Sequence, residues 1–89
     1  MDLSDEILIE KSYIEISKYR TRVMKTLIDD VKIPSQIAAD ADISQKHISG
    51  TLRQLREHEL VECINPEVKR GRLYRLTPKG RDVAQSIKQ

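Results

Sequence analysis

The sequence predicts a mainly α-helical domain with one small β-hairpin, an α+β fold. Apolar residues recur at helical spacing in several segments, and a basic turn near the C-terminal end separates two short β-rich runs. The chain has 89 residues, 38% of them hydrophobic, so it has room for one core only. A chain this short buries roughly 60% of its unfolded surface, which makes packing against a second copy a reasonable expectation.

Two helices are expected in the first part of the chain. Residues 1–16 are rich in apolar side chains, and we expect a helix in this N-terminal segment. This segment, the final helix of the chain, or both could form the interface of a dimer. Ser17 suits the N-cap of the second helix, because its hydroxyl can accept an unpaired amide of the first turn. The apolar face of that second helix consists of Tyr19, Val23, Met24, Leu27 and Ile28.

Two shorter helices follow. Pro34 suits the first turn of one of them, and Ser44 precedes the other, which spans about 44–57. Only a few residues separate the two, so they should cross at a large angle and form a helix-turn-helix. The residues expected to face the core are Ile37, Ala38 and Ala41 in the first, and Ile48, Leu52 and Leu55 in the second.

A β-hairpin is predicted after the helix-turn-helix. The run 61–64 is β-rich, Asn65 and Pro66 interrupt it, and 72–77 alternates basic and apolar side chains. Thr77 and Pro78 can then cap and open a last helix. A helix-turn-helix followed directly by such a hairpin is the winged helix-turn-helix arrangement, and we expect residues 17–89 to form this domain.

The run ISQKHISGTLRQLREHELVECINPEVKRGRLYRLTPKG resembles the recognition helix and wing of MarR/ArsR-like transcriptional regulators, especially small archaeal ones. The family pattern is roughly I-S-x-x-x-V-S-x-x-L-x-x-L-x-x-x-G-L-V, then a basic wing, then Y-x-L-T-x-x-G. The matches extend from about Ser17 to Gln85. The resemblance implies a regulator that binds double-stranded DNA. The sequence departs from the pattern at Glu59, where the family often has glycine, so we expect the helix to end through a different turn.

The charge distribution also favours DNA as a partner. Residues 1–42 contain nine acidic and six basic residues, whereas residues 43–89 contain five acidic and ten basic ones. Positive charge is therefore concentrated in the half that contains the helix about 44–57 and the hairpin, as expected if that half faces a polyanion. The simpler alternative is a solvated surface with uneven charge.

The outward face of the helix about 44–57 carries the candidate base contacts. An α-helix fits the major groove of B-DNA, where Gln can pair with adenine and Arg or Lys with guanine. Gly50 costs about 1 kcal/mol of helix stability relative to Ala. Either the backbone lies close to DNA or to another element there, or one base contact is missing. The predicted DNA-binding residues of this helix are Ser44, Gln45, Lys46, Ser49, Gly50 and Arg53.

The wing, about residues 66–72, carries the second set of candidate contacts. Its three cations can bind phosphate or reach a narrow minor groove, although a charged turn can also serve to protect a sheet edge. Basic residues of the second helix could add phosphate contacts, and an ordinary solvated face explains them equally well. The wing candidates are Lys69, Arg70 and Arg72, and the phosphate candidates are Arg20, Arg22 and Lys25.

Other functions are less well supported by the sequence. The chain has no phosphate-binding glycine loop and no nucleophile with its base, so we expect no enzyme activity and no cofactor. His47, His58 and Cys63 match no zinc-binding spacing, and we expect no metal. The alternative is a winged-helix protein-interaction module that binds an acidic partner. Single-stranded RNA ranks third, because the chain lacks Phe and Trp for base stacking.

The sequence also bears on location. It shows neither an apolar run long enough to span a membrane nor a typical leader at its start. With its single cysteine the chain cannot form an internal disulfide, which agrees with a reducing compartment. We therefore expect a cytoplasmic regulator that acts as a homodimer on double-stranded DNA.

Overall fold

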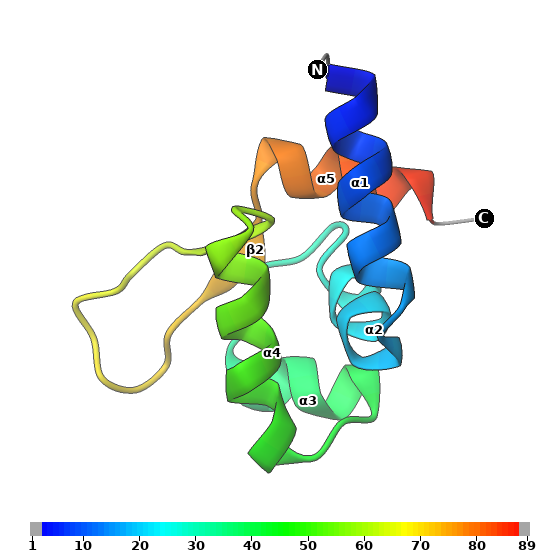
Figure 1. Cartoon of the computed structure of the whole chain (residues 1–89). Coiled ribbons are helices and arrows are strands. Elements are labelled where there is room, and N and C mark those ends of the chain that lie inside the picture. The colour runs from blue at the N-terminus through cyan, green and yellow to red at the C-terminus, as the bar shows by residue number, and fades with distance from the viewer. Residues whose placement is uncertain (1–2, 88–89) are drawn as a thin grey trace.

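The computed structural model describes residues 3–87 and confirms the mainly α fold with one hairpin. The five helices and two strands follow one another in the order expected for a winged helix-turn-helix (Figure 1). Within the described residues, no helix is long and apolar enough to cross a membrane. The elements are α1 (Leu3–Glu15), α2 (Lys18–Thr26), α3 (Pro34–Ala41), α4 (Gln45–Glu57), β1 (Val61–Cys63), β2 (Tyr74–Leu76) and α5 (Pro78–Ser86).

A single hydrophobic core joins all five helices. Each helix contributes at least one side chain with no exposed surface, and α1 packs against both α2 and α5. The stripe predicted to face inward from α4 is buried, as is the one predicted for α3, which confirms the helix-turn-helix. Examples of such fully buried residues, one from each helix in order, are Ile14, Met24, Ile37, Leu55 and Val83.

Two of the predicted N-caps are confirmed. Ser17 Oγ accepts a hydrogen bond from the Arg20 N–H of α2, and Thr77 Oγ1 accepts one from the Gly80 N–H of α5. Ser44 occupies the N-cap position of α4, but its side chain makes no capping hydrogen bond. The start of α4 is therefore set by its backbone and by the burial of Ile48, which leaves the exposed Ser44 side chain at the tip of the helix.

The sequence predicted that α4 would end through a turn other than the usual one, and this prediction is wrong. Glu59 has φ 60°, so a non-glycine residue adopts the left-handed conformation that the family usually gives to glycine. Its N–H bonds the Arg56 carbonyl at 2.9 Å, and the Leu60 N–H bonds the Leu55 carbonyl at 2.9 Å, which is the Schellman pattern. These two hydrogen bonds, together with the full burial of Leu60, offset the strain at Glu59.

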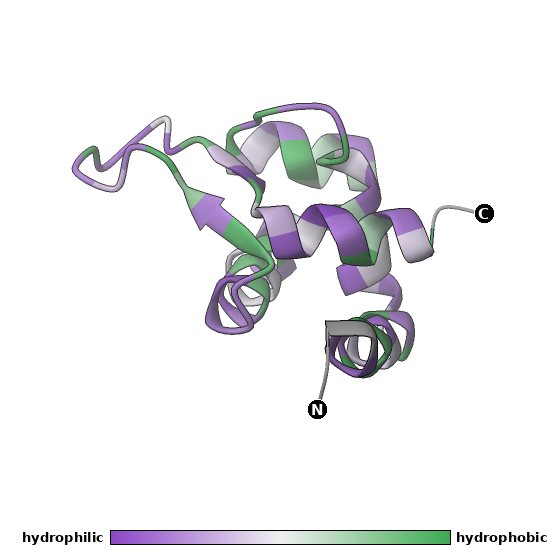
Figure 2. Ribbon diagram, turned by 90° about the horizontal axis from the view of Figure 1, so that it is seen from above, coloured by the Kyte–Doolittle hydropathy of each residue, from purple (hydrophilic) through white to green (hydrophobic). Residues whose placement is uncertain are grey.

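The hairpin is extended by a β-bridge that the sequence did not reveal. β1 and β2 are antiparallel, with Glu62 opposite Arg75, and Tyr74 and Leu76 are buried while Arg75 is exposed. On the edge of β2 that faces away from β1, Tyr74 exchanges two backbone hydrogen bonds with Lys32. Lys32 lies in a segment that was predicted to be only a connection. The returning strand is shorter than 72–77, and residues 64–73 form the wing loop, which extends away from the helices (Figures 1 and 2).

Candidate nucleic-acid interface

The polar face of α4 is presented to solvent. Ser44, Gln45, Lys46, Ser49 and Arg53 are all exposed, while the apolar stripe of the same helix is buried. In Figure 1 α4 lies between the wing loop and α2, and α4 also contacts β1, the strand that leads into the wing. This arrangement can place a helix in a groove and the wing beside it on the same nucleic acid.

Gly50 lies in an open position on α4. A Cβ atom built at Gly50 would have no atom within 4 Å, so no other part of the described chain requires a glycine there. The sequence allowed close contact between Gly50 and another element of the chain, and this explanation is wrong. Close approach of DNA and a missing base contact remain as explanations.

The side chain of Arg53 is available for binding. Its Nε atom lies 3.8 Å from a carboxylate oxygen of Glu57, one turn further along α4, and about two thirds of each side chain is exposed. Such surface pairs contribute only about 0.3–0.5 kcal/mol, so DNA can displace Glu57 from Arg53 at little cost.

The wing holds three basic side chains in different settings. Lys69 and Arg70 are exposed, whereas Arg72 is half-buried and its Nε donates to the Val68 carbonyl at 2.7 Å. Arg75 on β2 does not add to this set, because its Nε lies 2.9 Å from the Glu62 carboxylate on β1. The available positive charge of the hairpin is therefore concentrated at its tip.

The three basic residues of α2 have separate surroundings. Arg20 donates to the Tyr13 carbonyl at 3.0 Å and to the Gln54 side chain at 3.3 Å, so it joins α1 and α4 to α2. Arg22 reaches the Asp42 carbonyl at 3.4 Å, in the turn before α4. Lys25 is exposed and lines the same surface hollow as Arg22. Arg22 is thus the member of this set that lies beside the start of α4.

A cluster of charged side chains fixes α1 to the end of α4. Glu10 is only 7% exposed, and its carboxylate lies 3.1 Å from His58 Nδ1 and 3.5 Å from Lys79 Nζ. Glu6 also contacts Lys79, at 3.1 Å. Burial lowers the pKa of Lys79, but the hydrogen bonds and charges of Glu6 and Glu10 outweigh burial and raise the pKa above its usual 10.5.

The two histidines and the cysteine do not converge. His47 stacks on Tyr19 with ring centroids 5.0 Å apart, and His58 stacks on Tyr13 at 3.8 Å. Cys63 is half-buried in β1. Among residues 3–87, no group of three or more His, Cys, Asp or Glu side chains is placed to hold a metal ion.

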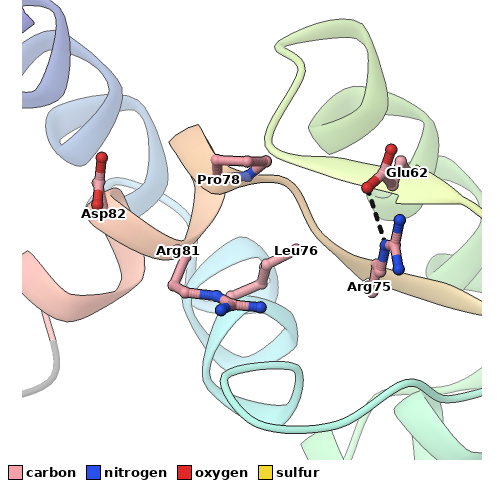
Figure 3. Close-up of a pocket in the computed structure, with 6 residues that line it drawn as sticks. All are labelled: Glu62, Arg75, Leu76, Pro78, Arg81 and Asp82. Atoms are coloured by element: carbon pink, nitrogen blue, oxygen red, sulfur yellow. Dashed lines mark hydrogen bonds and ion pairs between the residues drawn. The ribbon is translucent and has the colours of Figure 1, made fainter.

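A pocket lies between the hairpin and the start of α5. Its charged residues are of both signs, and the Glu62 carboxylate is already paired with Arg75 across the strands (Figure 3). The pocket therefore presents no concentrated charge of either sign. It is lined by Glu62, Arg75, Leu76, Pro78, Arg81 and Asp82.

Asn65 is the residue of the wing whose role the sequence did not predict. Its side chain bonds Gly71 and Leu73 across the wing loop, whereas the sequence indicated only that Asn65 ends a strand. An Asn-Pro pair between two strands signals a turn, and only the folded loop shows where the amide reaches.

A helix-turn-helix with an exposed polar second helix and a basic hairpin defines a winged helix-turn-helix domain of the kind found in transcriptional regulators. Residues 15–89 match the HxlR-like helix-turn-helix family, and the chain belongs to that family. A comparison with curated proteins gives no match.

Several solved structures share the fold, among them those of MarR-family regulators. A double mutant of ZitR from Lactococcus lactis is 24% identical, with a TM-score of 0.69 over 79% of this chain and 49% of that one. The MarR family regulator SP03579 is 26% identical, with a TM-score of 0.68 over 76% and 46%. SPO1453 from Silicibacter pomeroyi is 20% identical, with a TM-score of 0.70 over 92% and 61%. The chain spans about half the length of the first two proteins.

Proposed function

We propose that the protein is a sequence-specific transcriptional regulator that binds double-stranded DNA. Helix α4 lies in the major groove, and the wing, about residues 66–72, contacts the backbone or the minor groove. The observation that carries this proposal is a helix with an exposed polar face beside a wing loop whose residues Lys69 and Arg70 are exposed (Figure 1). Membership of a helix-turn-helix family supports it. Nothing in the fold favours the alternative of a module for an acidic protein.

Base readout is assigned to the first three turns of α4. Gln45 can pair with adenine, and Lys46 and Arg53 can pair with guanine. Ser44 and Ser49 can donate hydrogen bonds to phosphates or bases from the same exposed face. The open position of Gly50 allows the DNA to approach the helix backbone closely.

Affinity and register are assigned mainly to the wing. Lys69 and Arg70 are exposed and can contact phosphates, whereas Arg72 is half-buried and donates to the Val68 carbonyl. Phosphate contacts position a protein on the duplex without reading its sequence. Arg22 and Lys25 can contact a flanking phosphate, whereas Arg20 is already held by Tyr13 and Gln54.

A second copy of the chain is proposed to pack on the outer face of α1. Leu8 and Ile9 of α1 and Ile16, the residue directly after α1, are 60%, 52% and 80% exposed, although α1 buries its opposite face against the domain. α1 also lies at the edge of the molecule (Figure 2). A homodimer would place two α4 helices on half-sites roughly one helical turn, about 34–36 Å, apart.

The dimer is tested by measuring mass in solution. Changing Ile9 and Ile16 to Ser should convert a dimer into a monomer in light scattering after gel filtration, because both apolar side chains lose their partner. The matched control is Val31→Ser together with Ile64→Ser, which places serine at two exposed apolar positions outside α1. A wild-type chain that is monomeric at high concentration would contradict this part of the proposal.

Two further features of the proposal come from the sequence. The single cysteine favours a cytoplasmic location, and the regulators that the chain resembles favour an archaeal origin. Catalysis has no role in the proposal, because grooves and phosphates are recognised through hydrogen bonds and charge alone.

The DNA-binding proposal is tested by fluorescence anisotropy with duplexes from the promoter next to the gene. We expect the binding constant to fall linearly with salt on a logarithmic plot, with a slope of about −0.9 for each phosphate contact. A poly-glutamate chain is the control, because a module for an acidic protein would bind it as well as DNA. Absence of duplex binding at low salt would contradict the proposal.

A further inference from the structure

We propose that Asn65 is a positioning residue of the wing, because its side chain holds the wing loop in the conformation that presents Lys69 and Arg70. The inference deepens the proposed function and rests on it. Asn65 is uncharged and half-buried, and its role is to fix the backbone from which the two cations extend.

The side-chain amide of Asn65 binds two backbone groups on the returning arm of the loop. Its Oδ1 accepts a hydrogen bond from the Leu73 N–H at 2.7 Å, and its Nδ2 donates to the Gly71 carbonyl at 3.1 Å. A backbone N–H can only donate and a carbonyl can only accept, so these partners fix the orientation of the amide. Gly71 has φ 72°, so Asn65 holds the loop where its backbone adopts the left-handed conformation.

The backbone of Asn65 holds the other arm. Its carbonyl accepts a hydrogen bond from the Val68 N–H at 3.2 Å, which closes a turn with proline in the position that proline favours. Arg72 Nε then donates to the Val68 carbonyl at 2.7 Å. The two exposed cations therefore lie between Val68 and Gly71, and Asn65 holds both of these residues.

This arrangement matters for affinity because a loop that is already ordered loses less entropy on binding. Fixing one backbone residue costs roughly 1–2 kcal/mol, and an unrestrained wing would incur that cost when it meets DNA. Hydrogen bonds that order the loop beforehand improve binding without making any contact to the ligand.

Cys63 gives an independent readout of the same contact. Its Sγ donates to Asn65 Oδ1 at 3.6 Å, and it is the single cysteine of the sequence. The rate at which a thiol reagent modifies the protein therefore reports on the state of Asn65 without any DNA present. Loss of the amide should expose the thiol and speed its reaction several-fold.

The test compares Asn65→Ala with Gln85→Ala, which removes an exposed amide from α5 as a control. We expect Asn65→Ala to weaken duplex binding about tenfold and to flatten the salt slope by one to two phosphate contacts. Asn65→Asp keeps the acceptor for Leu73 but loses the donor to Gly71, so its affinity should be intermediate. In a Lys69→Ala/Arg70→Ala background, Asn65→Ala should cause little further loss.

Three results would overturn the inference. The first is an Asn65→Ala variant that keeps the duplex affinity and the salt slope of the wild type. The second is a loss of affinity on Asn65→Ala that is equally large in the wild type and in the Lys69→Ala/Arg70→Ala background. The third is an unchanged rate of Cys63 labelling. If the wild type binds no duplex, the proposed function fails, yet faster labelling of Asn65→Ala still supports the role of Asn65 in holding the wing.

Discussion

The imidazole ring of His58 lies flat against the phenol ring of Tyr13, with centroids 3.8 Å apart and planes 11° apart. The guanidinium carbon of Arg20 is also 3.8 Å from the centre of the Tyr13 ring. Two groups cannot share one ring face at that distance, so Tyr13 is held between Arg20 and His58. The stack therefore joins α1 to α2 and to the end of α4.

Replacement of Tyr13 tests this stack. Tyr13→Ala should lower the free energy of unfolding by about 2–4 kcal/mol, because it removes an aromatic pair, a cation–π contact and half-buried apolar surface. Tyr13→Phe keeps the ring and should lie within about 0.5 kcal/mol of the wild type. Urea unfolding followed by circular dichroism measures both. Equal stability of the two variants would show that the stack contributes nothing.

Two glycines in helices should respond in opposite ways to the same change. A Cβ atom at Gly80 in α5 would collide with the backbone carbonyl of Leu60, whereas one at Gly50 in α4 would meet no atom. We expect Gly80→Ala to destabilise the fold by roughly 3 kcal/mol or more. Gly50→Ala should stabilise it by about 1 kcal/mol through helix propensity.

The Gly50→Ala variant also separates stability from binding. If DNA approaches the backbone at Gly50, the variant will be more stable yet will bind duplex more weakly. Thermal unfolding and duplex titration on the same sample give both values. A variant that gains stability and keeps full affinity would assign Gly50 to the missing base contact instead.

Lys79 should make the stability depend on pH at the alkaline end. Its pKa in the folded protein is raised above 10.5, so the folded state holds the proton more tightly than the unfolded state does. Its contribution is fully present below the unfolded pKa and is lost as pH rises through the folded pKa. Unfolding in urea at about pH 8 and about pH 11 should show a loss that is smaller in Lys79→Gln. A loss of equal size in both proteins would contradict this role, and Lys25→Gln is the exposed control.

Much of the fold was predictable because local rules agree with the tertiary structure. The stripe of Ile48, Leu52 and Leu55 fixed the inner face of α4, and therefore its outer face. Ser17 and Thr77 marked two helix starts through their capping hydroxyls.

The remaining features depend on long-range contacts that spacing does not encode. The bridge from Lys32 to Tyr74 joins segments far apart in the chain. The sequence does not distinguish Arg20 from the other cations of α2, because its hydrogen bonds to Tyr13 and Gln54 depend on the packing of α1 and α4 against α2. Glu59 can adopt the left-handed conformation in place of glycine because the next residue, Leu60, is held by its burial in the core.

In the proposed complex, α4 reads the bases while the wing contacts the phosphate backbone of the DNA. The most direct test measures the ratio of affinities for a promoter duplex and a scrambled duplex, across a salt series, for Arg53→Ala and Arg70→Ala. We expect Arg53→Ala to lower the ratio, because a good base contact contributes about 1–3 kcal/mol of discrimination. Arg70→Ala should weaken both complexes alike and reduce the salt slope by about one contact. An unchanged ratio in Arg53→Ala together with an unchanged slope in Arg70→Ala would contradict the account.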